Sequence, residues 1–182
     1  MKKYFLFIII IVLSIILTSG CTSSGNQTAN NTSNIQTYSG DQFTFNYPPG
    51  WQQIASQAQN STVAVGDPST ADSNGNVQVN VEIQKSVKPS NVTFGQYYND
   101  TYTQFAAQNL GYKQLSDGTI VVNGKTALEN VYRINMGTLE QKRAVWIQNG
   151  KIVYIILCTA PVSQYNNQQA NFNIIVNSFK LI

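Results

Sequence analysis

The sequence predicts an α+β domain, in which a central antiparallel β-sheet is flanked by helices on both faces as an α/β/α sandwich. Asn-Gly pairs join strand-like runs at 149–150 and 123–124, and this pair favours tight hairpin turns because both residues tolerate positive φ. The run 152–158 is apolar at every position, as expected of a strand covered on both sides. Helical spacing of apolar residues at 93–110 and 163–177 supplies the covering layers.

The hairpin of 139–148 and 151–158 is the predicted centre of the sheet. Its second strand is apolar on both faces, so it should lie centrally, with one layer above and one below. A two-residue Asn149-Gly150 loop sets the register. The expected pairs are Gln148 with Lys151, Trp146 with Val153, Ala144 with Ile155, and Lys142 with Leu157.

The remaining strands are recognised by alternation of apolar and polar residues. In the first strand, Phe43, Phe45 and Tyr47 should point inward, and Pro48-Pro49-Gly50 ends it. The predicted strands outside the central hairpin are 41–47, 61–66, 77–84, 112–115, 119–122, 126–136 and a short terminal strand at 179–182.

The first helix, 93–110, should begin at Thr93 as N-cap residue. Phe94, Tyr98 and Phe105 form an aromatic stripe along it, which is typical of a surface that faces the core. Tyr97 and Tyr102 lie at the margins of that stripe. They either complete the core-facing surface or line a groove, and they are the candidate binding residues.

The N-terminus has the features of a secretory signal: Lys2 and Lys3 precede an apolar run, and small residues lead to Cys21. It resembles a lipoprotein signal, in which 1–20 are removed and Cys21 is lipidated. The alternative is an uncleaved membrane helix, since 4–20 is at the short limit for spanning a bilayer. Either alternative places the domain at the outer face of the cytoplasmic membrane, on the cell surface.

The polar segment 21–37 is expected to be a flexible tether, which leaves 38–182 as the folded domain. The chain carries Asn-x-Ser/Thr sequons in the tether and in the domain. In an exported protein they are candidate glycosylation sites. They start at Asn26, Asn30, Asn31, Asn60, Asn91 and Asn99.

The charge of the exported part is low. Without Lys2 and Lys3, nine of the 11 Lys and Arg residues remain against eight Asp and Glu, and no basic cluster is present, which argues against a nucleic-acid partner. If Cys21 is lipidated, Cys158 has no disulfide partner. Its apolar strand predicts a buried, inert thiol. No motif for a cofactor or a metal is found.

Several stretches resemble PsbP-like domains in order and spacing. They are Phe43-Thr44-Phe45-Asn46-Tyr47-Pro48-Pro49-Gly50-Trp51, Val122-Asn123-Gly124-Lys125-Thr126-Ala127, the strand 151–159, and Ile175-Val176-Asn177-Ser178-Phe179. The resemblance covers 38–182 and implies the Mog/PsbP-like fold. Photosynthetic members help to retain calcium and chloride at the oxygen-evolving centre, while many others are lipoproteins of unknown role. The tether, the sequons and the low charge are typical of a cell-surface protein from a non-photosynthetic prokaryote such as an archaeon.

The chain has no histidine, so no Ser-His-Asp or Cys-His catalytic arrangement can form. The acidic loop 67–76 lacks the ligand spacing of an EF-hand, which favours a solvated loop over a calcium site. The main hypothesis is a non-catalytic binding or assembly module, which offers its sheet edge or its aromatic groove to an envelope protein or a small ligand. The alternative is an envelope enzyme. It would require two carboxylates, or a Tyr beside Lys or Arg, in one pocket.

Overall fold

The computed structural model describes residues 35–182, with the exception of 57, 59 and 109. The signal segment, most of the tether, and with them Cys21 and the sequons at Asn26, Asn30 and Asn31, lie outside the described residues. Among the helices that are described, none combines the length and the apolar character that a bilayer span requires.

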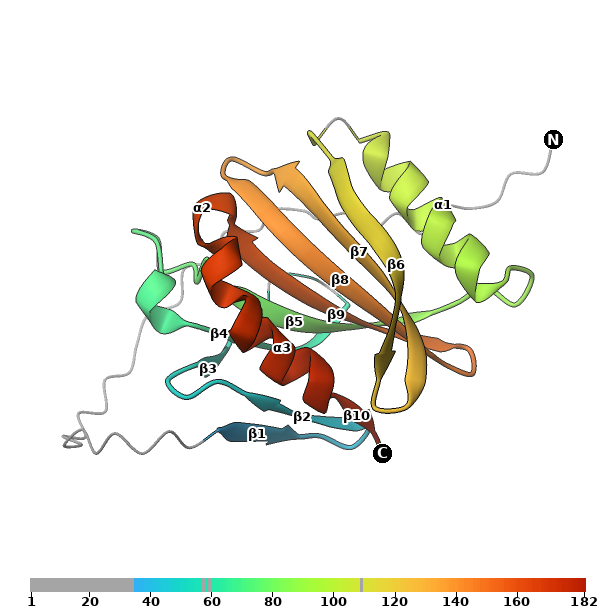
Figure 1. The fold of residues 1–182 in the computed structure, drawn as a ribbon, viewed down its shortest axis with the longest axis horizontal. Helices are drawn as coiled ribbons and strands as arrows, with labels where there is room; N and C mark the ends of the chain where they lie inside the picture. Colours follow the sequence, from blue (N-terminus) through green and yellow to red (C-terminus); the bar gives the residue numbers. More distant parts are fainter. Residues whose placement is uncertain (1–34, 57, 59, 109) are drawn as a thin grey trace. The chain divides into compact units, whose positions relative to one another are not determined.

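In the described part of the chain, the larger of two sheets has seven strands, and every neighbouring pair is antiparallel. Strand β9 occupies the middle position, as the sequence predicted (Figure 1). The order across the sheet is β3 (Gln52–Ile54), β4 (Ser61–Gly66), β5 (Asn80–Val87), β9 (Ile152–Pro161), β8 (Leu139–Asn149), β7 (Lys125–Asn135) and β6 (Lys113–Val122).

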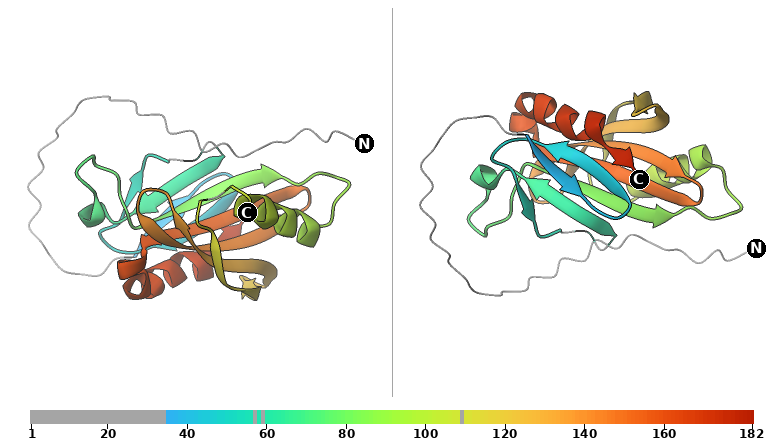
Figure 2. Two further views of the ribbon diagram at one scale, coloured as in Figure 1. Left: turned by 90° about the horizontal axis from the view of Figure 1, so that it is seen from above. Right: turned by 90° about the horizontal axis from the view of Figure 1, so that it is seen from below.

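A second, three-stranded sheet was not anticipated. It consists of β1 (Gln36–Ser39), β2 (Phe43–Tyr47) and β10 (Lys180–Leu181), with β2 in the centre. The two ends of the domain therefore meet in one small sheet, which Figure 2 shows beside the larger one. Strand β1 begins within the stretch expected to be tether. The alternation in β2 identified its buried side chains correctly, but alternation does not reveal which strand is the partner.

The first helix, α1 (Phe94–Ala106), begins as predicted with Thr93 as N-cap. The Thr93 hydroxyl accepts a hydrogen bond from the Gln96 backbone N–H (3.1 Å), and the Gln96 side chain accepts one from the Thr93 N–H (2.8 Å). This reciprocal pair is a capping box. The predicted helix at 163–177 is instead three successive pieces. They are α2 (Val162–Tyr165), the 3₁₀ turn η2 (Asn166–Gln168) and α3 (Gln169–Ser178); another 3₁₀ turn, η1 (Pro68–Thr70), follows β4.

Two clusters of buried side chains lie on opposite faces of β8 and β9, because successive side chains of a strand alternate in direction. On β8, Val145 and Ile147 belong to the first cluster, whereas Ala144 and Trp146 belong to the second. The first cluster also contains Phe43 and Phe45 of β2 and Phe172, Ile175 and Val176 of α3. The second contains Tyr98 of α1. The mixed α+β class with a large antiparallel sheet is therefore confirmed.

The central hairpin forms, but its predicted register is wrong by two residues. Asn149 pairs with Ile152, and Trp146 pairs with Ile155 instead of Val153. The loop residues are Gly150 and Lys151, with Gly150 at φ +62° and no positive φ at Lys151. This is the pattern of a type II′ turn, whose first central residue is Gly. Since the shift is even, every side chain still points to the predicted face.

The second Asn-Gly pair behaves as predicted. Asn123 and Gly124 both have positive φ, 50° and 78°, and they join Val122 directly to Lys125 in a two-residue turn of type I′. The strand before this turn is longer than expected. The predicted pieces 112–115 and 119–122 are parts of the single strand β6, whose pairing with β7 is irregular between Gln114 and Ser116.

Candidate functional site

The helix α1 carries an aromatic face that lies against β7, β8 and the segment before β6. Tyr98 and Tyr102 meet edge to face with ring centroids 4.9 Å apart, and both contact the indole of Trp146. Tyr102 also contacts Tyr112 and Tyr132, which lie next to one another. Aromatic pairs in such arrangements add attraction beyond the apolar area they bury. This packing makes α1 a firm support for side chains at its margin.

An open groove of about 320 Å³ lies between the margin of α1 and the edge of the large sheet. We call it the tyrosine groove. Three tyrosines, three amide side chains and one carboxylate dominate its lining, and the described lining residues include no Lys or Arg. From α1 come Tyr98, Asn99, Tyr102, Thr103 and Ala106; from the segment before β6, Tyr112; from β6, Gln114 and Asp117; and from β7, Asn130.

A chain of side-chain hydrogen bonds runs along the sheet side of the groove. Asn130 Nδ2 donates to the Tyr112 hydroxyl (3.1 Å), and this hydroxyl donates to Gln114 Oε1 (3.2 Å). Gln114 Nε2 then donates to Asp117 Oδ1 (2.9 Å). The pairing of β6 with β7 explains why this series begins and ends at neighbouring residues, since Asp117 lies directly opposite Asn130. The donor of each of these three hydrogen bonds therefore points toward the Asp117 carboxylate.

Asn130 is fully buried, and its Oδ1 has no hydrogen-bond partner among the described residues. A buried acceptor without a partner costs about 1–3 kcal/mol. Such atoms are uncommon in native proteins and often mark a place where a ligand, ion or water completes the structure. The sequence alone gave no signal for Asn130, because one polar residue in a strand is ordinary until its register is known.

The tyrosines of the groove stay protonated at neutral pH. Burial is the main cause that raises the pKa of Tyr98, of Tyr102 and of Tyr112 above the ordinary value. The negative charge of Asp117 raises the pKa of Tyr98 and Tyr112 further. The field of this carboxylate therefore reaches the groove, whose hydroxyls act as neutral hydrogen-bonding groups.

The two tyrosines singled out from the sequence have different positions. Tyr102 lines the groove, and its hydroxyl accepts a hydrogen bond of 2.9 Å from Trp146 Nε1. Tyr97 is not among the lining residues, and its ring packs edge-on against Trp146. Of the sequons within the described residues, Asn91 and Asn99 are exposed, whereas Asn60 is partly buried with its Oδ1 enclosed. Asn99 also lines the groove.

A second hollow of about 240 Å³ has a mainly apolar floor that includes Val122, Ile147, Phe179 and Leu181, with the two cations Lys125 and Lys180 also among its lining residues. In the part of the chain that the structure describes, Asp117 is the one carboxylate that lines either of these two cavities. Among the lining residues that are described, neither cavity brings a Tyr together with Lys or Arg. The arrangement that the enzyme hypothesis requires is thus not found at either place.

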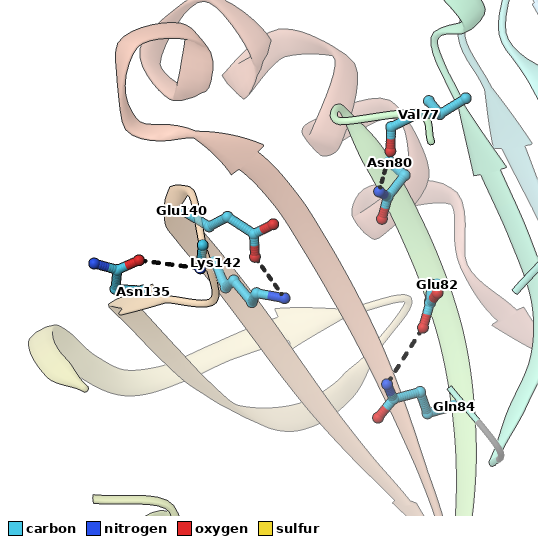
Figure 3. Close-up of polar contacts among 8 residues, drawn as sticks. Val77, Asn80, Glu82, Gln84, Asn135, Glu140 and Lys142 are labelled. Carbon is cyan, nitrogen blue, oxygen red and sulfur yellow. Dashed lines mark hydrogen bonds and ion pairs between the residues drawn. The ribbon is translucent and has the colours of Figure 1, made fainter. Parts of the chain in front are cut away.

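Other polar groups of the sheet are paired locally (Figure 3). At the start of β8, Glu140 forms an ion pair of 3.0 Å with Lys142, and on β5 the Gln84 amide donates to Glu82 at 3.5 Å. On the opposite side of β8, Arg143 forms a 2.7 Å ion pair with Glu129. Glu140 and Glu129 are therefore each paired with a cation of β8.

The acidic loop between β4 and β5 uses its carboxylates for its own structure. Asp72 Oδ1 accepts backbone N–H bonds from Asn74 (2.8 Å) and Asn76 (2.9 Å), and the bond from Asn76 is the main cause that lowers the Asp72 pKa. Asp67 Oδ1 accepts from the backbone and hydroxyl of Ser69. No group of three or more metal-ligating side chains occurs within the described ranges.

Cys158 lies on β9 with no exposed surface, as its apolar strand predicted. Burial raises its pKa to about 12, while the nearby Arg143 has a smaller opposing effect. The thiolate is the reactive form of cysteine, so burial and the raised pKa disfavour reaction of this thiol in the folded protein.

The fold and the groove define a class: an antiparallel α+β domain with an open, tyrosine-lined site at the edge of its large sheet. Comparison with known proteins places it further. The model of the PsbP-like protein family matches residues 5–181, and the chain belongs to this family. No curated protein matches it.

Solved structures similar to this chain share its fold at low sequence identity. Cyanobacterial PsbP (CyanoP) from Synechocystis sp. PCC 6803 is 16% identical, with a TM-score of 0.61 over 87% of this chain and 98% of that one. The Ran-binding protein Mog1p of Saccharomyces cerevisiae is 11% identical, with a TM-score of 0.55 over 82% and 96%. LpqN, involved in cell envelope biogenesis of Mycobacterium tuberculosis, is 13% identical, with a TM-score of 0.53 over 83% and 87%.

Proposed function

We propose that this PsbP-like protein is a non-catalytic binding or assembly module of the cell envelope, and that its tyrosine groove receives the partner. The observation that carries the proposal is the buried Asn130 Oδ1, which has no partner among the described residues and belongs to a side chain that lines the groove. A ligand that donates a hydrogen bond to this oxygen would remove the cost of leaving it unpaired.

The position of the groove also favours binding. Gln114 and Asp117 lie on β6, the last strand of the large sheet, so a partner can approach from the open side. In this proposed arrangement, α3 and α1 cover the two faces of the sheet and its edge stays accessible. Two structural relatives, the Ran-binding protein Mog1p and LpqN, which is involved in cell envelope biogenesis, have roles of the same kind.

Site-specific photocrosslinking in cells tests this function. A photoreactive amino acid at Thr103, which lines the groove, is compared with the same group at its neighbour Gln104, which is exposed on α1 but does not line it. The expected result is that the group at Thr103 crosslinks one defined molecule in a saturable way, whereas the group at Gln104 does not crosslink it. Equal yields at both positions, or none at either, would contradict a binding role for the groove.

The proposal includes an anchor at the outer face of the cytoplasmic membrane, through lipid on Cys21 or through an uncleaved helix at 4–20. Mass spectrometry of the N-terminal peptide distinguishes these two, because only the first begins at a modified Cys21. Cys21→Ser should release the protein from a lipid anchor into the medium. Peptide mass spectrometry of the same sample also shows whether Asn91 and Asn99 are glycosylated. A glycan on Asn99 would obstruct the groove.

A further inference from the structure

The chemistry of the tyrosine groove restricts the kind of ligand that fits it. Asp117 is the one charged side chain among the described residues that line the groove, so they contribute a single negative charge. It therefore disfavours phosphate and carboxylate groups and favours a cation. Asp117 also influences the hydroxyls of Tyr98 and Tyr112, which shows that its charge is felt inside the groove.

The direction of the hydrogen-bond chain narrows the ligand further. The donors of Asn130, Tyr112 and Gln114 that form the chain all point toward Asp117. At the other end, Asn130 Oδ1 has no partner among the described residues, and this atom is an acceptor. A matching ligand has N–H donors and no need of an acceptor, which describes an ammonium group better than a hydroxyl.

Aromatic side chains make up the rest of the match. Tyr98, Tyr102 and Tyr112 line the same groove. The rings of Tyr102 and Tyr112 are stacked, with an interplanar angle of 26° and ring centroids 6.1 Å apart. The faces of aromatic rings attract cations, and groups of aromatic side chains recognise ammonium ligands in this way. Tyrosine contributes this attraction without adding a charge of its own.

We propose that the tyrosine groove binds a primary ammonium group, which donates to Asn130 Oδ1, lies against the tyrosine rings and is balanced by Asp117. This inference rests on the proposed function of the groove as a binding site. Because Asn130 Oδ1 is shielded from solvent, the ammonium group displaces the side-chain atoms that cover this oxygen when it binds. The source is either a free amine or a lysine side chain of a partner protein.

Calorimetric titration of the full-length protein in mild detergent tests the ligand class. The probe is n-butylammonium at neutral pH, and the neutral control of equal length is 1-butanol. We expect n-butylammonium to bind at least about tenfold more tightly, as an electrostatic and cation–π contribution predicts. Tetramethylammonium, which has no N–H donor, should bind more weakly than n-butylammonium. Equal affinities of n-butylammonium and 1-butanol would overturn the proposal, and equal affinities of the two cations would remove Asn130 from it.

Two variants of matched charge locate the site. Asp117→Asn should weaken n-butylammonium binding about tenfold. Asp100→Asn removes the same charge from an exposed position on α1 outside the groove, and it should leave binding unchanged. Equal effects of the two substitutions would overturn the assignment of Asp117. Circular dichroism of both variants shows whether each is folded.

Two further comparisons separate the source of the amine and the source of a failure. The probe for a lysine side chain is Nα-acetyl-lysine methylamide, whose side-chain ammonium group is free. If it binds more tightly than n-butylammonium, the ligand is a lysine side chain of a protein; if it binds equally or more weakly, the ligand is a free amine. If crosslinking from Thr103 succeeds while n-butylammonium and 1-butanol bind alike, the ammonium inference fails and the binding function stands. If crosslinking is absent as well, both fail.

Discussion

The indole nitrogen of Trp146 donates a hydrogen bond of 2.9 Å to the hydroxyl of Tyr102, so strand β8 is linked to helix α1 beneath the tyrosine groove. Trp146 is only 2% exposed, and water does not replace this acceptor easily. The bond fixes the position of Tyr102 and therefore one wall of the groove.

Tyr102→Phe should reduce the free energy of unfolding by about 1–3 kcal/mol, because it leaves the buried indole N–H without its acceptor. Tyr97→Phe is the matched control, since the Tyr97 ring packs against the same indole, and it should change stability by less than about 0.5 kcal/mol. Urea denaturation measures both. Equal losses in the two variants would show that the hydrogen bond is not the cause.

Gly150→Ala should destabilise the protein by about 1–2 kcal/mol, because an L side chain at φ +62° meets the backbone unfavourably. Gly118→Ala in β6 is the control. Gly118 has no positive φ, and a Cβ there would meet no atom within 4 Å, so this change should be neutral or slightly stabilising. Thermal unfolding of the two variants checks the turn assignment, and a harmless Gly150→Ala would contradict it.

Alkaline pH should destabilise the protein through its buried tyrosines. Burial raises the pKa of Tyr132 above its ordinary value of 10.0, so above pH 10 the unfolded chain loses a proton that the folded chain keeps. The contribution of such a tyrosine to the free energy of unfolding is therefore complete below pH 10. Above pH 10 the free energy of unfolding falls by about 1.4 kcal/mol per pH unit for each such group. In Tyr132→Phe the decline between pH 10 and 11 should be less steep. Parallel declines in both proteins would rule out a contribution from Tyr132.

Cys158 should resist thiol reagents at pH 8 in the folded protein. Its pKa is raised to about 12, so little thiolate forms at pH 8, and it has no exposed surface that a reagent can reach. Addition of denaturant should make it react fully. Peptide mass spectrometry after brief alkylation distinguishes the two states, and rapid modification without denaturant would show that β9 opens locally.

The sequence was sufficient where a local pattern has one physical solution. Thr93 and Gln96 determine the start of α1, because their capping box involves only neighbouring residues. The apolar run of β9 predicted its central place, since a strand with no polar face must be covered on both sides. Asn123-Gly124 likewise formed the expected turn.

Tertiary structure decided what depends on distant partners. Asn149-Gly150 permits more than one tight turn, and the packing of β8 against β9 selected the one that shifts the register by two residues. The small sheet required strands from both ends of the domain to meet, which no local pattern encodes. Asn130 acquired its role in the same way: only the pairing of β7 with β6 and the packing of α1 buried its amide oxygen among tyrosines, without a partner in the described structure.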